Sequence, residues 1–186
     1  MKHDLYVDWA LDYLVEQDCS TADACLKLLA NNPVSITYLN AFGRWLGAVV
    51  DKGDVRINAI MEAFAGGKTN GKWGHCIMTV IGCSQTYAAT FFSQFDAALK
   101  ANNYTLFDQL VDVLDVSCKK VSQYFEYKGE RYPIYNPVGR GWDEAVLFAD
   151  RYKEDYYFNH LGVVLKLLSG YSRMGKKALA MQEAAQ

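Results

Sequence analysis

The chain has 186 residues, of which 51% are hydrophobic, 14% aromatic and 22% charged, and its formal net charge is −2. A chain of this length is expected to fold as one domain and to bury about 70% of the surface that its unfolded form exposes. The composition excludes an intrinsically disordered chain, and the small net charge excludes a global electrostatic attraction to nucleic acid or to an anionic membrane.

The N-terminal segment has the spacing of two consecutive helices. Residues 4–17 are expected to be helical, with a buried face at i, i+3 and i+4 spacing that carries Tyr6, Trp9, Ala10, Tyr13 and Leu14. A second, shorter helix is expected from a cap at Ser20 or Thr21 through Leu29, because Pro33 disfavours helical geometry in the residue before it. These two elements are predicted to form a helical hairpin.

Two further helices precede a glycine-rich stretch. The third is expected to begin near Ser35 or Thr37 and to run to Val50, with Gly53 as its stop. The fourth is expected to run from a cap at Asp54 to the glycine pair at 66–67. The apolar run at 76–81 fits either a helix or a strand.

The glycine-rich stretch at 63–76, AFAGGKTNGKWGHC, is close in sequence to a phosphate-binding loop. Such a loop has the pattern G-x-x-x-x-G-K-S/T, and it leaves a strand to enter a helix. Alignment on Gly67 puts Glu62 at the position of the first glycine, and the residues before the loop have a helical pattern. We therefore expect a connector that binds no nucleotide or other cofactor, and whose partner contacts would be Lys68, Lys72 and Trp73.

The second half of the chain has a helical pattern that is interrupted once. Helices are predicted at 84–100, from a cap at Thr105 to about 121, at 143–153 and at 156–168. Between them, aromatic and polar residues alternate around Gly129, which predicts a β-hairpin near 124–135. Residues 176–186 carry few large apolar side chains and are expected to fray.

Together these elements predict a mainly α fold. We expect a single compact domain, residues 1–186, of about seven or eight helices with one short hairpin. No run of 18 uncharged apolar residues occurs, and Asp4, Asp8 and Asp12 interrupt the first apolar stretch. These features predict neither a membrane span nor a signal peptide.

The cysteines and histidines provide no catalytic signature. The odd number of cysteines and the lack of a C-x-x-C pair predict reduced thiols and a cytoplasmic location. His75, Cys76 and Cys83 are fewer ligands than the four of a structural zinc site, so we expect no metal. His160 lies in an apolar helical pattern and is expected to be a hydrogen-bonded core residue.

An acidic row runs along the first predicted helix, where Asp4, Asp8, Asp12 and Glu16 recur every four residues. Like charges at this spacing cost about 0.2–0.5 kcal/mol per neighbouring pair. Because no lysine is interleaved in the row, we expect positively charged groups outside this helix to balance it. Two interpretations stay open: the row is solvated or pairs with lysines and arginines of the same chain, or it contacts a basic partner surface.

The segment around the predicted hairpin combines aromatic side chains with lysine and arginine. Its candidate partner-binding residues are Tyr127, Lys128, Arg131, Tyr132, Tyr135, Arg140 and Trp142. Such a ribbon has more rings than one face of a short hairpin can bury, so some should be exposed. Tyrosine, tryptophan and arginine are enriched at protein interfaces, and aromatic rings also stack on single-stranded bases. The alternative is that these rings cover helix ends as a satellite core.

The sequence is interpreted as a non-enzymatic protein-interaction module. A small chain with ample core and no catalytic motif is typical of the proteins that phages and other mobile elements use to block or recruit a host protein, so an inhibitor or adaptor is the favoured role. The second interpretation is binding of single-stranded nucleic acid through residues 124–142. A third is a small enzyme that uses His75 or His160, although nothing in the sequence pairs either with a catalytic partner.

Overall fold

The computed structural model describes residues 2–33, 35–118, 121–127, 129–135 and 140–170, and most of these residues are helical. The helices are α1 (Lys2–Asp18), α2 (Ala22–Leu29), α3 (Ile36–Lys52), α4 (Arg56–Ala65), α5 (Gly71–Cys83), α6 (Tyr87–Gln94), α7 (Asp96–Cys118), α8 (Gly141–Arg151), α9 (Lys153–Tyr156) and a helical segment at 161–170. Strands β1 (Val121–Tyr127) and β2 (Glu130–Tyr135) pair antiparallel. The predictions of a mainly α fold and of a hairpin near 124–135 are confirmed.

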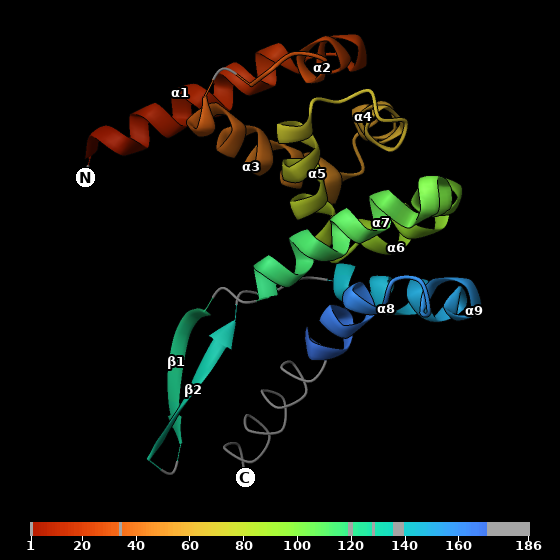
Figure 1. Cartoon of the computed structure of the whole chain (residues 1–186). Helices are drawn as coiled ribbons and strands as arrows, with labels where there is room; N and C mark the ends of the chain where they lie inside the picture. The colour runs from red at the N-terminus through yellow and green to blue at the C-terminus, as the bar shows by residue number, and fades with distance from the viewer. Residues whose placement is uncertain (1, 34, 119–120, 128, 136–139, 171–186) are drawn as a thin grey trace.

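The helices are stacked from one end of the molecule to the other (Figure 1). Helices α1 and α2 lie at the top, with α3 and α5 below them, followed by α6 and α7 and then by α8 and α9. Contacts between α1 and α3, α3 and α5, α5 and α7, and α6 and α8 join these parts. The hairpin projects away from the helices at the lower left of the view.

The helix starts of the N-terminal half follow the local capping signals. The side chains of Thr21 and Ser35 each accept a hydrogen bond from a backbone N–H three residues later, at 3.2 and 3.1 Å. The Asp54 carboxylate accepts one from a backbone N–H two residues later, at 2.9 Å. Gly53 ends α3 in the left-handed conformation, with φ of 66°. The caps at Thr21 and Ser35 and the stop at Gly53 were predicted, because each depends on a few neighbouring residues, whereas the N-cap of α4 is Val55 and not the predicted Asp54.

Helix α7 contains the break that was predicted near residue 101. Asn102, Asn103 and Tyr104 have φ of 51°, 55° and 59°, so three consecutive residues other than glycine are left-handed. The break separates the first turns of α7 from the long second part that begins near Thr105. The buried ring of Tyr104 packs edge-on against Tyr156, with the ring centroids 4.9 Å apart. This packing offsets the cost of the left-handed backbone, about 1–3 kcal/mol per residue.

Aromatic rings dominate the core between α7 and α8. Phe107 lies 4.5 Å from Phe148 and 5.2 Å from Tyr156, measured between ring centroids. Phe92 of α6 packs edge-on against Phe107 from the other side, at 6.3 Å. All four residues are buried. Each aromatic ring of this kind buries roughly 150–250 Å² of surface.

The predicted buried face of the first helix is wrong. Tyr6, Trp9 and Tyr13 are 72%, 73% and 68% exposed, and Ala10 and Leu14 are exposed as well. Helix α1 instead packs on the core through Leu11 and Val15, and Cys19, directly after the helix, continues this four-residue spacing. Apolar side chains occupy two sides of this helix, and the side with smaller residues is the buried one.

Helices α5 and α8 approach each other closely where two glycines meet. A Cβ atom at Gly141 would lie 2.5 Å from the Cα atom and 2.6 Å from the backbone oxygen of Gly82, so no side chain fits there. The Arg140 N–H donates a hydrogen bond of 3.2 Å to the Ser84 carbonyl beside this contact. The start of α8 is therefore held directly against the end of α5.

Gly141→Ala should destabilise the protein, because the new methyl group must push two backbone segments apart. Overpacking of this kind costs roughly 1–3 kcal/mol or more. The control is Gly162→Ala, where a Cβ atom meets nothing within 4 Å and the helix should gain up to about 1 kcal/mol. Urea unfolding measures both free energies. Equal stability of the two variants would contradict the close contact.

Candidate functional site

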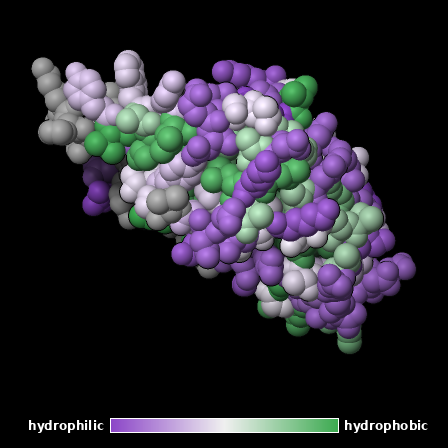
Figure 2. Space-filling model, turned by 90° about the horizontal axis from the view of Figure 1, so that it is seen from above, coloured by the Kyte–Doolittle hydropathy of each residue, from purple (hydrophilic) through white to green (hydrophobic). Residues whose placement is uncertain are grey.

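The outer face of α1 is an exposed apolar surface made of Tyr6, Val7, Trp9, Tyr13 and Leu14. Each helical residue advances by about 100° around the axis, so these positions share one broad side of the helix, opposite Val15. Figure 2, which looks onto the α1 and α2 end of the molecule, shows green and pale side chains gathered beside hydrophilic purple ones. A cluster of exposed aromatic rings on one helix is a feature of interaction sites.

The acidic row adjoins this face, between the aromatic rings and the buried side of α1. The Asp8 and Asp12 carboxylates lie 3.3 and 2.7 Å from the same nitrogen of Arg44, which belongs to α3. Glu16 accepts a hydrogen bond from the Trp45 indole and forms an ion pair of 2.9 Å with Arg56. Three carboxylates of the row therefore pair with arginines of the same chain, which was one of the two interpretations of the row. The Asp4 side chain lies outside the described residues.

Arg56 of α4 joins three parts of the chain around the end of α1. Its guanidinium donates to the Asp54 carboxylate at 2.9 and 2.8 Å and to the Cys19 carbonyl at 2.7 Å. The guanidinium carbon also lies 5.1 Å from the centroid of the Trp45 ring. Hydrogen bonds from Arg56 lower the pKa of Asp54 to about 2. Arg56 is largely buried, so these bonds hold the C-terminal end of α1 firmly.

The partner contacts predicted in the glycine-rich loop separate into exposed and buried residues. Lys68 is exposed in the connection between α4 and α5, and Lys72 is exposed in the first turn of α5. Trp73 is fully buried, and the prediction that it contacts a partner is wrong. Its indole donates a hydrogen bond of 2.7 Å to the Asn31 carbonyl and packs edge-on against Phe42, so it fixes the loop to α2 and α3.

The loop also has the helical context that was expected of a connector. Helix α4 precedes it, whereas a phosphate-binding loop follows a strand. Asn70 caps α5 by accepting a hydrogen bond of 3.2 Å from the Lys72 N–H, and its backbone N–H donates to the Leu29 carbonyl at 3.0 Å. The loop is therefore attached at its end to α2.

The structure describes the side chains of three of the contact residues predicted around the hairpin: Arg131, Arg140 and Trp142. Arg131 and Arg140 are exposed, and Arg140 pairs with Glu144 at 3.1 Å. Trp142 is fully buried, which corrects its prediction as a contact residue: its indole packs beneath Gly170, where an added Cβ atom would meet the ring at 2.0 Å. The remaining predicted side chains lie outside the described residues: Tyr127, Lys128, Tyr132 and Tyr135.

His75, Cys76 and Cys83 lie on α5, whereas His160 follows α9. The His160 Nδ1 atom forms a hydrogen bond of 2.8 Å with one Asp108 carboxylate oxygen, and the other oxygen accepts from the Tyr156 hydroxyl at 2.7 Å. The imidazole also stacks on the Tyr156 ring at 4.6 Å, so His160 is the hydrogen-bonded core histidine that was expected. His75 is exposed on α5. Within the described ranges, no group of three or more His, Cys, Asp or Glu side chains could hold a metal ion.

The residues that the sequence interpretation missed are the outer rings of α1 and the two arginines behind it. Tyr6, Trp9 and Tyr13 were assigned to the core, and Arg44 and Arg56 received no role. A signal was present, because Leu11, Val15 and Cys19 formed a second apolar row along the same segment.

No protein-family model matches this chain, and no curated protein matches it in sequence. Among the described residues, no helix combines the length and the apolar character that crossing a bilayer requires.

The pairing of Asp8 and Asp12 with Arg44 should be measurable as a coupling in stability. The double-mutant cycle compares a variant with both Asp8→Asn and Asp12→Asn, the Arg44→Gln variant, and the combination of all three changes. The coupling in the free energy of unfolding should be about 0.2–1 kcal/mol, because these side chains are half exposed. The coupling should shrink in 1 M salt. Asp150→Asn, at another exposed aspartate, serves as the control. Strict additivity with Arg44→Gln would contradict the pairing.

Proposed function

We propose that this chain is a non-enzymatic protein-interaction module that binds its partner through the outer face of α1. The observation that carries the proposal is the exposure of Tyr6, Trp9 and Tyr13 in one row on a helix whose opposite side packs on the core. Tryptophan and tyrosine supply most of the binding energy at protein interfaces when they enter a partner's pocket. A soluble chain would otherwise gain by carrying polar side chains at these positions.

The acidic row specifies the chemistry of the partner. Asp8, Asp12 and Glu16 keep about half of their side-chain surface exposed although they pair with arginines. A carboxylate accepts up to about four hydrogen bonds, so each can accept another from outside. The partner surface that fits α1 is therefore an apolar groove that receives the rings and is bordered by lysine or arginine. Such a border would also raise the association rate.

The finer role that we propose is that of an inhibitor or adaptor that acts on a host protein in the cytoplasm, encoded by a phage or another mobile element. It rests on the small size and general character of the chain. The exposed Lys68, Lys72, Arg131 and Arg140 are then additional contact residues outside the α1 face.

Binding of single-stranded nucleic acid stays a prediction. Arg131 and Arg140 are exposed and would reach phosphates. Trp142 is buried and does not serve as a stacking platform, which leaves fewer rings for this alternative.

Trp9→Ala should abolish capture of the partner while leaving the fold intact. In a pull-down from a lysate followed by mass spectrometry, the parent chain should retain a defined protein, and purified partner should then bind the variant at least about 30-fold more weakly, as expected for a hot spot of 2 kcal/mol. Phe158→Ala is the matched control, because Phe158 is a fully exposed ring away from α1.

Three outcomes would count against this proposal. Equal partner affinity of Trp9→Ala and the parent would exclude the α1 face. An equal loss in Phe158→Ala would point to nonspecific apolar binding. Release of all captured material by nuclease treatment, with steep salt dependence, would support nucleic acid as the ligand instead.

A further inference from the structure

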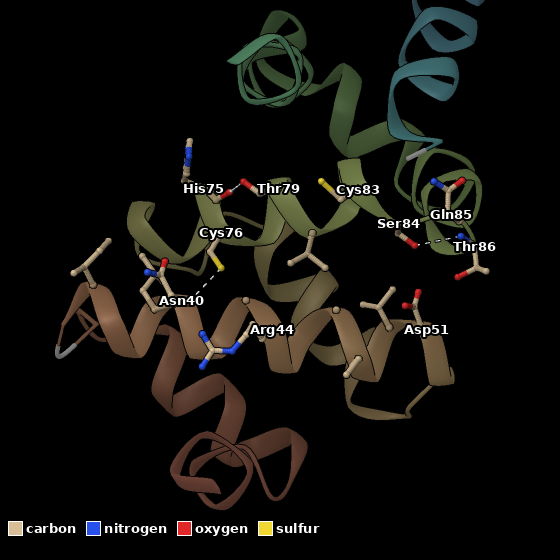
Figure 3. A pocket seen from close by; sticks show the side chains of 17 residues that line it. Asn40, Arg44, Asp51, His75, Cys76, Thr79, Cys83, Ser84, Gln85 and Thr86 are labelled. Carbon is tan, nitrogen blue, oxygen red and sulfur yellow. Dashed lines mark hydrogen bonds between the residues drawn. The ribbon is translucent and has the colours of Figure 1, made fainter. Parts of the chain in front are cut away.

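A groove between α3 and α5 lies apart from the outer face of α1. Its volume is about 1070 Å³, which is sufficient for a small organic molecule. Residues from α3, α5 and the connection to α6 line it. Figure 3 shows α3 below and α5 above the groove, with Cys76 directed toward α3.

Two glycines of α3, Gly43 and Gly47, line the groove and place no side chain in it. Gly43 lies against the Cys76 sulfur, where an added Cβ atom would be 3.0 Å away, so the two helices touch at this point. One helical turn further, a Cβ atom at Gly47 would meet nothing within 4 Å. The groove is therefore open above Gly47, and Ala48 and Val80 contribute further small apolar surface.

One end of the groove carries a carboxylate without an internal counterion. Asp51 lines this end together with Gln85 and Thr86, and Figure 3 labels the three residues at the same end of the pocket. Among the described residues, Asp51 has no ion-pair partner. Arg44, on the groove wall, is already paired with two carboxylates of α1. Of the side chains that line the groove, Arg44 is positively charged and Asp51 negatively charged, and the charge that no ion pair matches among the described residues lies at the Asp51 end.

We propose that this groove binds a small aliphatic amine, with the ammonium group at Asp51 and the hydrocarbon chain over Gly47 toward Gly43. The carboxylate supplies a charge-assisted acceptor, and Thr86 and Gln85 supply oxygen acceptors for the remaining ammonium protons. Gly43 and Asp51 are eight residues apart on α3, a rise of about 12 Å, which sets the length of the apolar chain. With a single carboxylate at one end, a monoamine fits better than a diamine.

The test uses n-octylamine, n-octanoate and n-octanol, which share a chain length and differ in charge. Titration calorimetry at low ionic strength and below the micelle concentration should show binding of octylamine, weaker binding of octanol and none of octanoate. Asp51→Asn should lower the octylamine affinity about tenfold or more and remove its advantage over octanol. Asp150→Asn, at an exposed carboxylate outside the groove, should leave both affinities unchanged.

Gly47→Leu provides a second test, because leucine would fill the open space above the α3 backbone. The variant should fold with at least the parent stability and lose binding of all three probes. Binding of octanoate as tight as that of octylamine would overturn the proposal, as would unchanged octylamine affinity in Asp51→Asn. Absence of octylamine binding to the parent chain, or its persistence in Gly47→Leu, would equally exclude this groove.

Discussion

Two arginines hold α1 by its acidic edge, and this attachment decides which side of the helix meets solvent. Arg44 pairs with Asp8 and Asp12, and Arg56 pairs with Glu16 at the other end. A rotation of α1 that buried its aromatic side would break these pairs and leave the guanidinium of Arg56 with fewer acceptors in a largely buried position, which is costly. The polar contacts therefore keep the rings of α1 outside, where a partner can reach them.

The parts of the fold that depend on neighbouring residues could be predicted from the sequence. The caps at Thr21 and Ser35 are examples, and the hairpin around Gly129 is another, because its turn requires a left-handed residue with φ of 79°. The orientation of α1 could not be predicted in this way. It depends on Arg44, more than thirty residues from the carboxylates that it binds, and local periodicity contains no information about that pairing.

The environments of individual tryptophans and glycines could not be predicted from local sequence either. Trp142 lies beside an aromatic, cationic segment, and its burial follows from the approach of Gly170. Glycines that look alike in the sequence differ as well. Gly141 is required for contact between two backbones, whereas Gly47 leaves open the groove between α3 and α5. The stacking of the helices thus determines both candidate binding surfaces, and Arg44 belongs to both, because it lines the groove and pairs with Asp8 and Asp12 of α1.

The exposure of Trp9 tests this account most directly. The chain has four tryptophans, of which Trp9 is 73% exposed, whereas Trp45, Trp73 and Trp142 are at most 7% exposed. Acrylamide quenching of the parent fluorescence should therefore reveal one readily quenched component. Trp9→Phe should remove that component without lowering the unfolding midpoint. If quenching is unchanged in Trp9→Phe and the variant unfolds more readily, Trp9 is a core residue and α1 has the opposite orientation.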